Sequence, residues 1–234
     1  ILVVNGDIAF DLDLKSLLRQ HRQQSRLATL AVVRRRDRPA LHKVVFDASS
    51  SSVRSFDGDA SRGAPEGQEL GIFTGIHVIS EGLFARLEVK VNQATCIVHH
   101  GYRSLLEEEL IGARRLAGRW DDLGTAEDLL RANHEALRRA TVDSFAGRRG
   151  LEQPQEGVWI ARGARIDPSV RLTPPLLIGR DAVIAAGASI GPLAVIGARA
   201  QVGAGARLRS VLVLHDTEVS GAHAGEVLFN GART

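Results

Sequence analysis

The sequence begins with residues 1–7, ILVVNGD. Four apolar residues in a row, three of them β-branched, predict a strand buried on both faces, as in the interior of a parallel sheet. The run stops at Asn5 and Gly6, so that Asp7 follows at the carboxyl end of the strand. Ligands of open α/β sheets bind at this end. A carboxylate there suits Mg²⁺ held between protein and phosphates, and the plainer interpretation of the same residues is a turn or a helix cap.

The composition of the chain limits its class. Of its 234 residues, 44% are hydrophobic and 24% charged, as in globular domains. No apolar run approaches the ~18 residues that span a bilayer, and the net charge of +3 is small. We therefore expect neither a membrane nor a nucleic acid as partner. The single cysteine, Cys96, excludes an internal disulfide framework and favours a cytoplasmic location.

The start of the chain is unusual. The sequence contains no methionine, and its first residue already belongs to the apolar run of the predicted strand. A natural start would supply an initiator methionine and usually some residues before the first core strand. We therefore expect that an N-terminal segment is missing from this sequence.

The residues after Asp7 alternate between helical and extended patterns. Asp11 or Asp13 can cap a helix that continues to about Gln24, and residues 26–33 (RLATLAVV) predict the next buried strand. A strand, a helix and a strand in about 33 residues form a βαβ unit, which implies parallel strands and a right-handed crossover. Residues 43–47 and 53–56 predict the two arms of a hairpin.

A longer strand and several helices are expected next. Residues 71–80 (GIFTGIHVIS) predict a strand whose two glycines allow a ligand or another backbone to approach closely. Short helices are expected after Ser80 and over residues 102–110. Thr125, with Asp128 three residues later, is close to a capping box and begins a helix that ends near Arg139.

From residue 160 the sequence has a period of six. An aliphatic residue recurs at every sixth position, often followed by glycine and with alanine four positions later. This is the hexapeptide repeat of a parallel β-helix, in which three hexads form one coil of about 18 residues. After position 208 the register slips, which predicts an irregular final coil. The inward-facing positions are Ile160, Ile166, Leu172, Ile178, Ile184, Ile190, Ile196, Val202 and Leu208.

These patterns predict a chain of three parts. Residues 1–140 form an α/β domain, residues 141–157 form a polar linker rich in glycine, and residues 158–234 form the β-helix.

Four stretches in this order resemble the sugar-1-phosphate nucleotidyltransferases. They are residues 1–7, residues 73–79 (FTGIHVI), residues 120–133 (WDDLGTAEDLLRAN) and the hexads. The likeness is greatest to the mannose-1-phosphate guanylyltransferase (GDP-mannose pyrophosphorylase) type. It implies a partial Rossmann-like nucleotidyltransferase domain followed by a left-handed parallel β-helix.

The resemblance also implies a reaction and a site. The family makes a nucleotide-sugar and pyrophosphate from a nucleoside triphosphate and a sugar 1-phosphate, with Mg²⁺ held by two aspartates that match Asp7 and Asp122. Positions that match Asn5, Gly6, Thr74 and Gly75 border the nucleotide and the sugar. Such transfer depends on positioning and charge neutralisation more than on covalent chemistry. The β-helix is expected to serve packing and assembly, in a homo-oligomer or in a hetero-oligomer with a homologue.

The sequence also departs from the family pattern. The family's glycine-rich loop, with its phosphate-binding lysine, should precede residue 1 and is absent. The family's Glu-Lys-Pro should follow Phe56, where the chain has residues 57–60 (DGDA), and Lys43 replaces a glycine that borders the sugar. These departures leave open a chain that is inactive at this length, a different substrate, or a non-catalytic regulatory subunit that binds a nucleotide-sugar and a catalytic homologue.

Other interpretations of single residues stay open. Asp7 could cap a helix, and Asp122 could form a salt bridge beside Asp121. His99 and His100 are neighbours on one segment and so are expected to point apart rather than to bind a metal together. His215 and His223 would suit a hexapeptide acyltransferase, in which a histidine acts as general base, or a scaffold.

Overall fold

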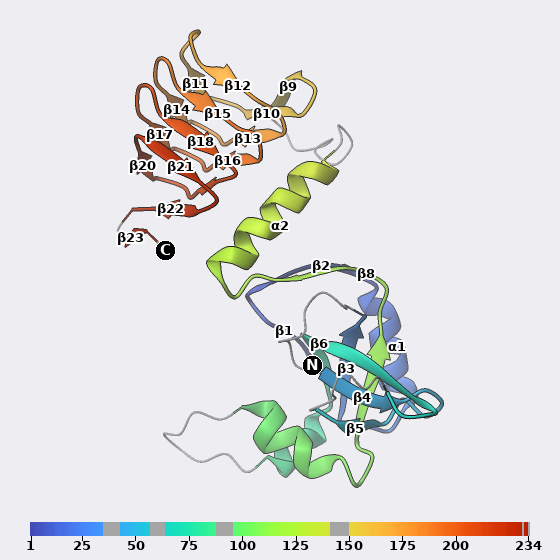
Figure 1. Ribbon diagram of the computed structural model, residues 1–234. Helices are drawn as coiled ribbons and strands as arrows, with labels where there is room; N and C mark the ends of the chain where they lie inside the picture. Colours follow the sequence, from blue (N-terminus) through green and yellow to red (C-terminus); the bar gives the residue numbers. More distant parts are fainter. Residues whose placement is uncertain (35–42, 57–63, 88–95, 141–149, 231, 234) are drawn as a thin grey trace. The chain divides into compact units, whose positions relative to one another are not determined.

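The computed structural model describes residues 1–34, 43–56, 64–87, 96–140, 150–230 and 232–233. The chain divides into two compact units, Ile1–Asp122 and Leu123–Thr234 (Figure 1). The departures at residues 57–60 lie outside the described residues, as does most of the predicted linker. None of the helices in the described ranges is long and apolar enough to cross a membrane.

The first unit is built on a six-stranded sheet. Five strands are hydrogen-bonded in the order β5-β4-β6-β3-β7, and the sixth strand, β1, also pairs with β6. Only β3 and β7 are parallel neighbours, whereas β1, β3 and β4 all pair antiparallel with β6. The strands are β1 (Leu2–Val4), β3 (Ala28–Val33), β4 (Lys43–Asp47), β5 (Val53–Ser55), β6 (Gln68–Ile79) and β7 (Ile111–Arg115).

The predicted burial of β1 on both faces is wrong. Leu2 and Val4 are 39% and 40% exposed, and Val3 between them packs against the core. β1 has β6 as its one strand partner in the described part of the chain. β6 lies between β1 and β3, so these two strands run parallel, as the βαβ pattern predicts, without being hydrogen-bonded to each other.

Both faces of the sheet are covered. Helix α1 (Leu14–Gln23) packs Leu17 against Ala31 and Ile76 on one face. On the other face, Leu30 packs with Tyr102 and other residues of three short helical segments. These segments are η1 (Glu81–Arg86), η2 (Val98–Tyr102) and η3 (Arg103–Leu105), so the helix predicted over residues 102–110 begins and ends earlier than expected. Every residue of β3 is buried as a result.

Of the two aspartates expected to cap α1, Asp13 is the N-cap. Its carboxylate accepts hydrogen bonds from the backbone N–H groups of Lys15 and Ser16. Asp11 lies instead in β2 (Ile8–Leu12), a strand that the sequence analysis did not predict. β2 pairs antiparallel with β8 (Gly118–Asp122) in a separate two-stranded ribbon. This ribbon carries the end of the first unit back beside its beginning.

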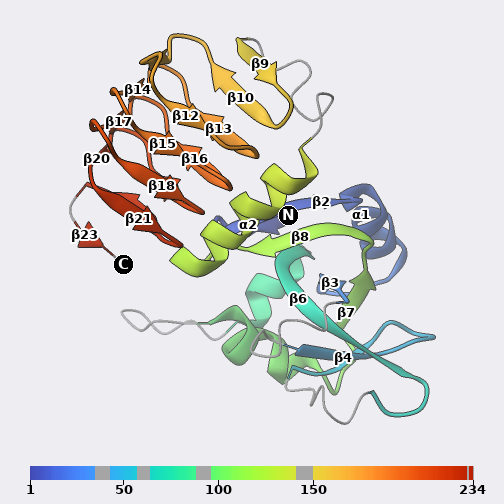
Figure 2. The same ribbon diagram turned by 45° about the horizontal axis from the view of Figure 1, so that its top comes forward.

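The second unit is a parallel β-solenoid of about four turns, which confirms the predicted β-helix (Figure 2). Ile160 pairs with Ile178, and Ile178 with Ile196, each 18 residues apart. The last coils are shorter, because Ile196 pairs with Val213 and Leu208 with His223. The predicted slip after Leu208 is therefore confirmed, and the left-handed sense stays a prediction.

The solenoid strands form three rows. The first row holds β9 (Leu151–Gln155), β10 (Val158–Ala161), β13 (Leu176–Ile178), β16 (Ala194–Ile196), β19 (Leu212–Val213), β22 (Val227–Phe229) and β23 (Ala232–Arg233). The second holds β11 (Arg165–Ile166), β14 (Val183–Ile184), β17 (Gln201–Val202) and β20 (Glu218–Val219). The third holds β12 (Arg171–Leu172), β15 (Ser189–Ile190), β18 (Arg207–Arg209) and β21 (Ala222–Ala224).

The compact units differ from the predicted domain boundaries. Helix α2 (Ala126–Arg139), capped by Thr125 as predicted, belongs to the second unit. Its Leu130 packs with Leu212 and Val227 on the outer side of the first row, because these aliphatic side chains point away from the solenoid core. β9, expected within the linker, pairs antiparallel with β10 and extends the same row.

Candidate functional site

The first unit contains a cavity of about 270 Å³ in which most of the predicted site residues meet. Asn5 and Asp7 border it from the segment after β1, Thr74 and Gly75 from β6, and Asp122 from the end of β8. Gly6 is the one predicted site residue that does not line it. The remaining lining residues are Ile8, Phe73, His77, Cys96, Ile97, Val98, His99 and Trp120.

Strand register brings the two predicted metal ligands together. In the β2–β8 ribbon, Ile8 is the direct partner of Asp122, and Asp7 is the residue before Ile8. Facing Cα atoms of an antiparallel pair lie about 4.5–5.5 Å apart, so the two aspartates are near neighbours although 115 positions separate them in sequence. Two carboxylates at one cavity supply hard oxygen donors suited to a divalent cation.

The two carboxylates do not form a complete metal site. The described ranges hold no group of three or more His, Cys, Asp and Glu side chains that could bind a metal. A Mg²⁺ ion normally takes one or two carboxylates and completes its octahedron with water and phosphate oxygens, so a two-carboxylate set fits this ion when a phosphate ligand is present. His99 lines the cavity, whereas Nδ1 of His100 bonds the backbone of Cys96, so these neighbours do not act as a pair.

Asn5 and Gly75 hold β1 and β6 together at the cavity. The backbone N–H of Asn5 donates to the Gly75 carbonyl at 3.0 Å. Gly75 has φ of +75°, and a Cβ there would lie 2.6 Å from Asn5 Nδ2. A Cβ on Gly6 would meet no protein atom within 4 Å. Gly75 is therefore required by the protein itself, whereas the space beside Gly6 is open to a ligand.

The hydroxyl of Thr74 is used within the protein. It donates to the carbonyl of Ala31 at 2.9 Å and accepts from the N–H of Ile76, and the residue is 1% exposed. The Thr74 carbonyl accepts a hydrogen bond from Nε1 of Trp120 at 2.9 Å. Thr74 thus fixes the shape of β6 and connects the main sheet to the ribbon. Its predicted contact with a sugar would come from its backbone or its methyl group.

His77, which lines the cavity, forms a buried pair with Tyr102 that the sequence did not predict. Nδ1 of His77 lies 3.0 Å from the hydroxyl oxygen of Tyr102, and both residues are buried. Burial lowers the pKa of His77 to about 4 and raises the pKa of Tyr102 above its usual 10. Both side chains are therefore neutral at pH 7. A buried strand residue has no distinctive sequence signal, and only the position of His77 beside Gly75 could have pointed to it.

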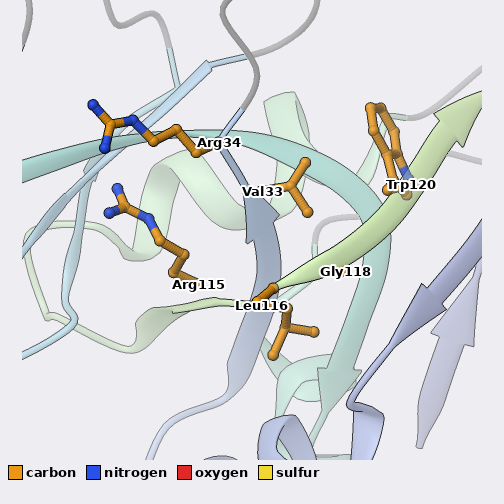
Figure 3. A pocket seen from close by; sticks show the side chains of 7 residues that line it. Val33, Arg34, Arg115, Leu116, Gly118 and Trp120 are labelled. Carbon is orange, nitrogen blue, oxygen red and sulfur yellow. The ribbon is translucent and has the colours of Figure 1, made fainter.

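A second cavity, of about 440 Å³, is also lined by Trp120 (Figure 3). Arg34 and Arg115 extend along one side of it, and Val33, Leu116 and Trp120 form the apolar part. Arg115 is already paired with Glu69 at 2.7 Å. None of the predicted site residues lines this cavity.

The late histidines do not support an acyl-transfer site. In His223 both ring nitrogens are engaged, Nδ1 with Glu226 and Nε2 with the carbonyl of Ser220, each at 2.9 Å. A general base needs a free ring nitrogen to accept a proton. His215 is exposed at a turn of the last coil.

Comparison with known proteins identifies a matching family and a relative of the chain. The sequence profile of the family described as "Nucleotidyl transferase" matches residues 1–139, more than half of the chain. Mannose-1-phosphate guanylyltransferase catalytic subunit beta of Drosophila pseudoobscura pseudoobscura is 27% identical over 131 residues, which are 55% of this chain and 32% of that protein. The chain thus spans about a third of the length of this curated relative. On the extent of the profile match, the chain belongs to the nucleotidyl transferase family.

Proposed function

We propose that this chain is a sugar-1-phosphate nucleotidyltransferase, which forms a nucleotide-sugar and pyrophosphate from a nucleoside triphosphate and a sugar 1-phosphate. The observation that carries the proposal is the meeting of Asp7 and Asp122 in one cavity with Asn5, Thr74 and Gly75. Two acidic residues 115 positions apart in sequence are brought to one site by the register of this ribbon. Membership of the nucleotidyl transferase family supports the reaction class.

In this proposal Asp7 and Asp122 hold Mg²⁺. The cation supplies charge neutralisation for the phosphates of the two substrates. The ribbon keeps the two carboxylates in place, and the open side of Gly6 lets the nucleotide or the sugar phosphate approach the backbone. Gly75 and Thr74 define the wall against which the sugar binds, with the ring of Phe73 beside them.

Guanine and mannose are the first substrates to test. The name of the Drosophila relative gives mannose 1-phosphate and a guanylyl group, and the same name describes that protein as a catalytic subunit. The likeness supports a chain that works in an assembly, as a homo-oligomer or with a homologue. The single cysteine supports a cytoplasmic location.

The test measures binding and turnover on the same protein. Calorimetry with mannose 1-phosphate and other sugar 1-phosphates, with and without Mg²⁺, should show binding that requires the cation. Pyrophosphate release is then measured with each nucleoside triphosphate in turn. Because the chain spans 32% of its relative, cation-dependent binding is the decisive measurement. If no sugar 1-phosphate bound and no combination of nucleoside triphosphate and sugar 1-phosphate released pyrophosphate, the proposal would be wrong.

A second candidate is a non-catalytic regulatory subunit. It is motivated by Lys43, which takes the place of a glycine of the family, although Lys43 does not line the cavity. Such a subunit would bind a nucleotide-sugar without turnover and would co-purify with an active homologue. Pyrophosphate release by the purified chain would exclude this candidate.

A further inference from the structure

The imidazole of His77 forms part of the wall of the candidate site, next to Phe73 and Gly75 on β6. Its ring centroid lies 5.6 Å from that of Phe73 and 5.7 Å from that of Tyr102, to which it is nearly perpendicular. The only hydrogen bond of the ring within the described residues joins Nδ1 to the Tyr102 hydroxyl, at 3.0 Å.

The proton on this hydrogen bond can be assigned from Tyr102. The side chain of Tyr102 is fully buried, and its hydroxyl has no other hydrogen-bond partner in the described part of the chain. Burial raises its pKa, so the hydroxyl keeps its proton at pH 7. If Nδ1 carried a proton, the buried O–H would have no acceptor, which disfavours that tautomer by about 5- to 150-fold in population. The O–H of Tyr102 therefore donates to Nδ1.

The other nitrogen of the ring must then carry the imidazole proton. A neutral imidazole has one N–H, and when Nδ1 accepts, Nε2 is the donor. No hydrogen bond to Nε2 is found within the described residues, and His77 is one of the residues that line the cavity, so the cavity is where a partner for Nε2–H would come from.

We infer that His77 is a specificity-determining residue whose Nε2–H, fixed by Tyr102, donates a hydrogen bond to an uncharged oxygen of the sugar in a bound sugar 1-phosphate. This inference rests on the proposed function. A neutral imidazole offers direction without charge, which suits a hydroxyl or carbonyl oxygen, while the phosphate is drawn to the cation at Asp7 and Asp122. Tyr102 is a positioning residue, because it acts on the sugar only through the ring of His77.

The tautomer can be measured without any activity. Nitrogen-15 chemical shifts of His77, from two-bond correlation spectra of the labelled chain at pH 7, should show a protonated Nε2 and an unprotonated Nδ1. The exposed His100 serves as an internal comparison within the same spectrum. In Tyr102→Phe the shifts of His77 should move toward a mixture of the two tautomers. A protonated Nδ1 in the wild-type chain would overturn the inference.

Binding then tests the role of the donor. Calorimetry with mannose 1-phosphate and Mg²⁺ compares wild type with His77→Phe, His77→Gln and Tyr102→Phe. Loss of a neutral hydrogen bond should weaken binding about 3- to 10-fold in His77→Phe, and the amide of His77→Gln, which can present an N–H near the same place, should restore most of it. The thermal midpoint of each variant checks that it is folded. Equal affinities for wild type and a folded His77→Phe would overturn the inference.

The two proposals fail in different ways. If the wild-type chain binds no sugar 1-phosphate from the panel, the proposed function and the sugar assignment both fall. If it binds with unchanged affinity after His77→Phe and His77→Gln, the proposed function stands and the role of His77 falls.

Discussion

The two units of this chain encode their structures in different ways. In the solenoid, each inward aliphatic residue stacks on its counterpart in the next coil, so that Ile166, Ile184 and Val202 form one continuous row. In the first unit, polar contacts that occur only once join segments distant in sequence, such as the guanidinium of Arg26, which donates to the carbonyls of Ser50 and Ser51. A repeat specifies a fold through a period, whereas a binding site depends on contacts that occur once. Substitutions at single positions in each unit can test this contrast.

Removing one carboxylate should abolish ligand binding and leave the solenoid intact. Loss of a residue that merely holds a metal ligand in place typically lowers metal affinity ~10–100-fold. Asp7→Asn or Asp122→Asn removes a proposed ligand itself, and should therefore weaken Mg²⁺-dependent binding of a sugar 1-phosphate by more than this. Asp11→Asn, on the same ribbon and outside the cavity, is the matched control. Calorimetry measures the affinity, and unchanged binding in both cavity variants would contradict the metal assignment.

Shortening one inward side chain should destabilise the solenoid strongly. Ile190 is fully buried and stacks between Leu172 and Leu208. Ile190→Ala should therefore lower the free energy of unfolding of this unit by about 2–5 kcal/mol. Ile166→Ala, in the first coil and half-buried, should cost less, because Ile166 pairs with Ile184 alone among the described strands. Urea titrations followed by circular dichroism measure both, and equal losses would argue against coil stacking as the source of stability.

Acid should destabilise the first unit through its buried histidine. Burial lowers the pKa of His77 to about 4 from an ordinary value of 6.5, so the unfolded chain takes up this proton first. The contribution of His77 is complete above pH 6.5 and is lost as the pH falls to 4, by about 3 kcal/mol in total. Unfolding free energies at pH 7.5 and 4.5 should differ less in His77→Gln than in wild type. A pH dependence that stays the same in this variant would assign the acid sensitivity to other groups.

Two glycines at the site should behave differently. Gly75→Ala places a Cβ against Asn5 at positive φ and should cost about 1–3 kcal/mol of stability. Gly6→Ala meets no protein atom and should leave stability unchanged. If a ligand approaches the backbone of Gly6, the same variant should still weaken binding several-fold, which calorimetry can detect. Full affinity in Gly6→Ala would show that the ligand does not approach the backbone at Gly6.

The elements that the sequence predicted well have strong local signals. The period of six predicted the solenoid and its inward residues, because each hexad repeats the same packing environment. Thr125, and either Asp11 or Asp13, were expected at helix starts, and Thr125 and Asp13 accept the capping hydrogen bonds of their helices. The hairpin of β4 and β5 lies at the predicted residues, since short apolar segments flank a serine-rich turn.

The features that the sequence missed depend on tertiary pairing. The β2–β8 ribbon joins residues more than a hundred positions apart, and nothing in residues 8–12 alone indicates a strand partner. β6 lies between β1 and β3 and is antiparallel to both, and hydrophobic periodicity does not predict which strands become neighbours in a sheet. The site residues were proposed from a resemblance to a family, and the cavity that most of them line rests on this ribbon and on Trp120. His77 has the sequence context of an ordinary core residue.

The ribbon has a consequence for the proposed cation site. Asp7 and Asp122 are neighbours because Ile8 faces Asp122, and that alignment continues to the facing pair Leu12 and Gly118. Each residue of offset would move one carboxylate about 3.3 Å along its strand, which exceeds the reach of a short metal–oxygen bond. One inserted residue that shifts the pairing of Ile8 with Asp122 would therefore erase the site while every ligand remained in the sequence. The proposed cation site thus depends on the register of β2 and β8 as much as on the presence of Asp7 and Asp122.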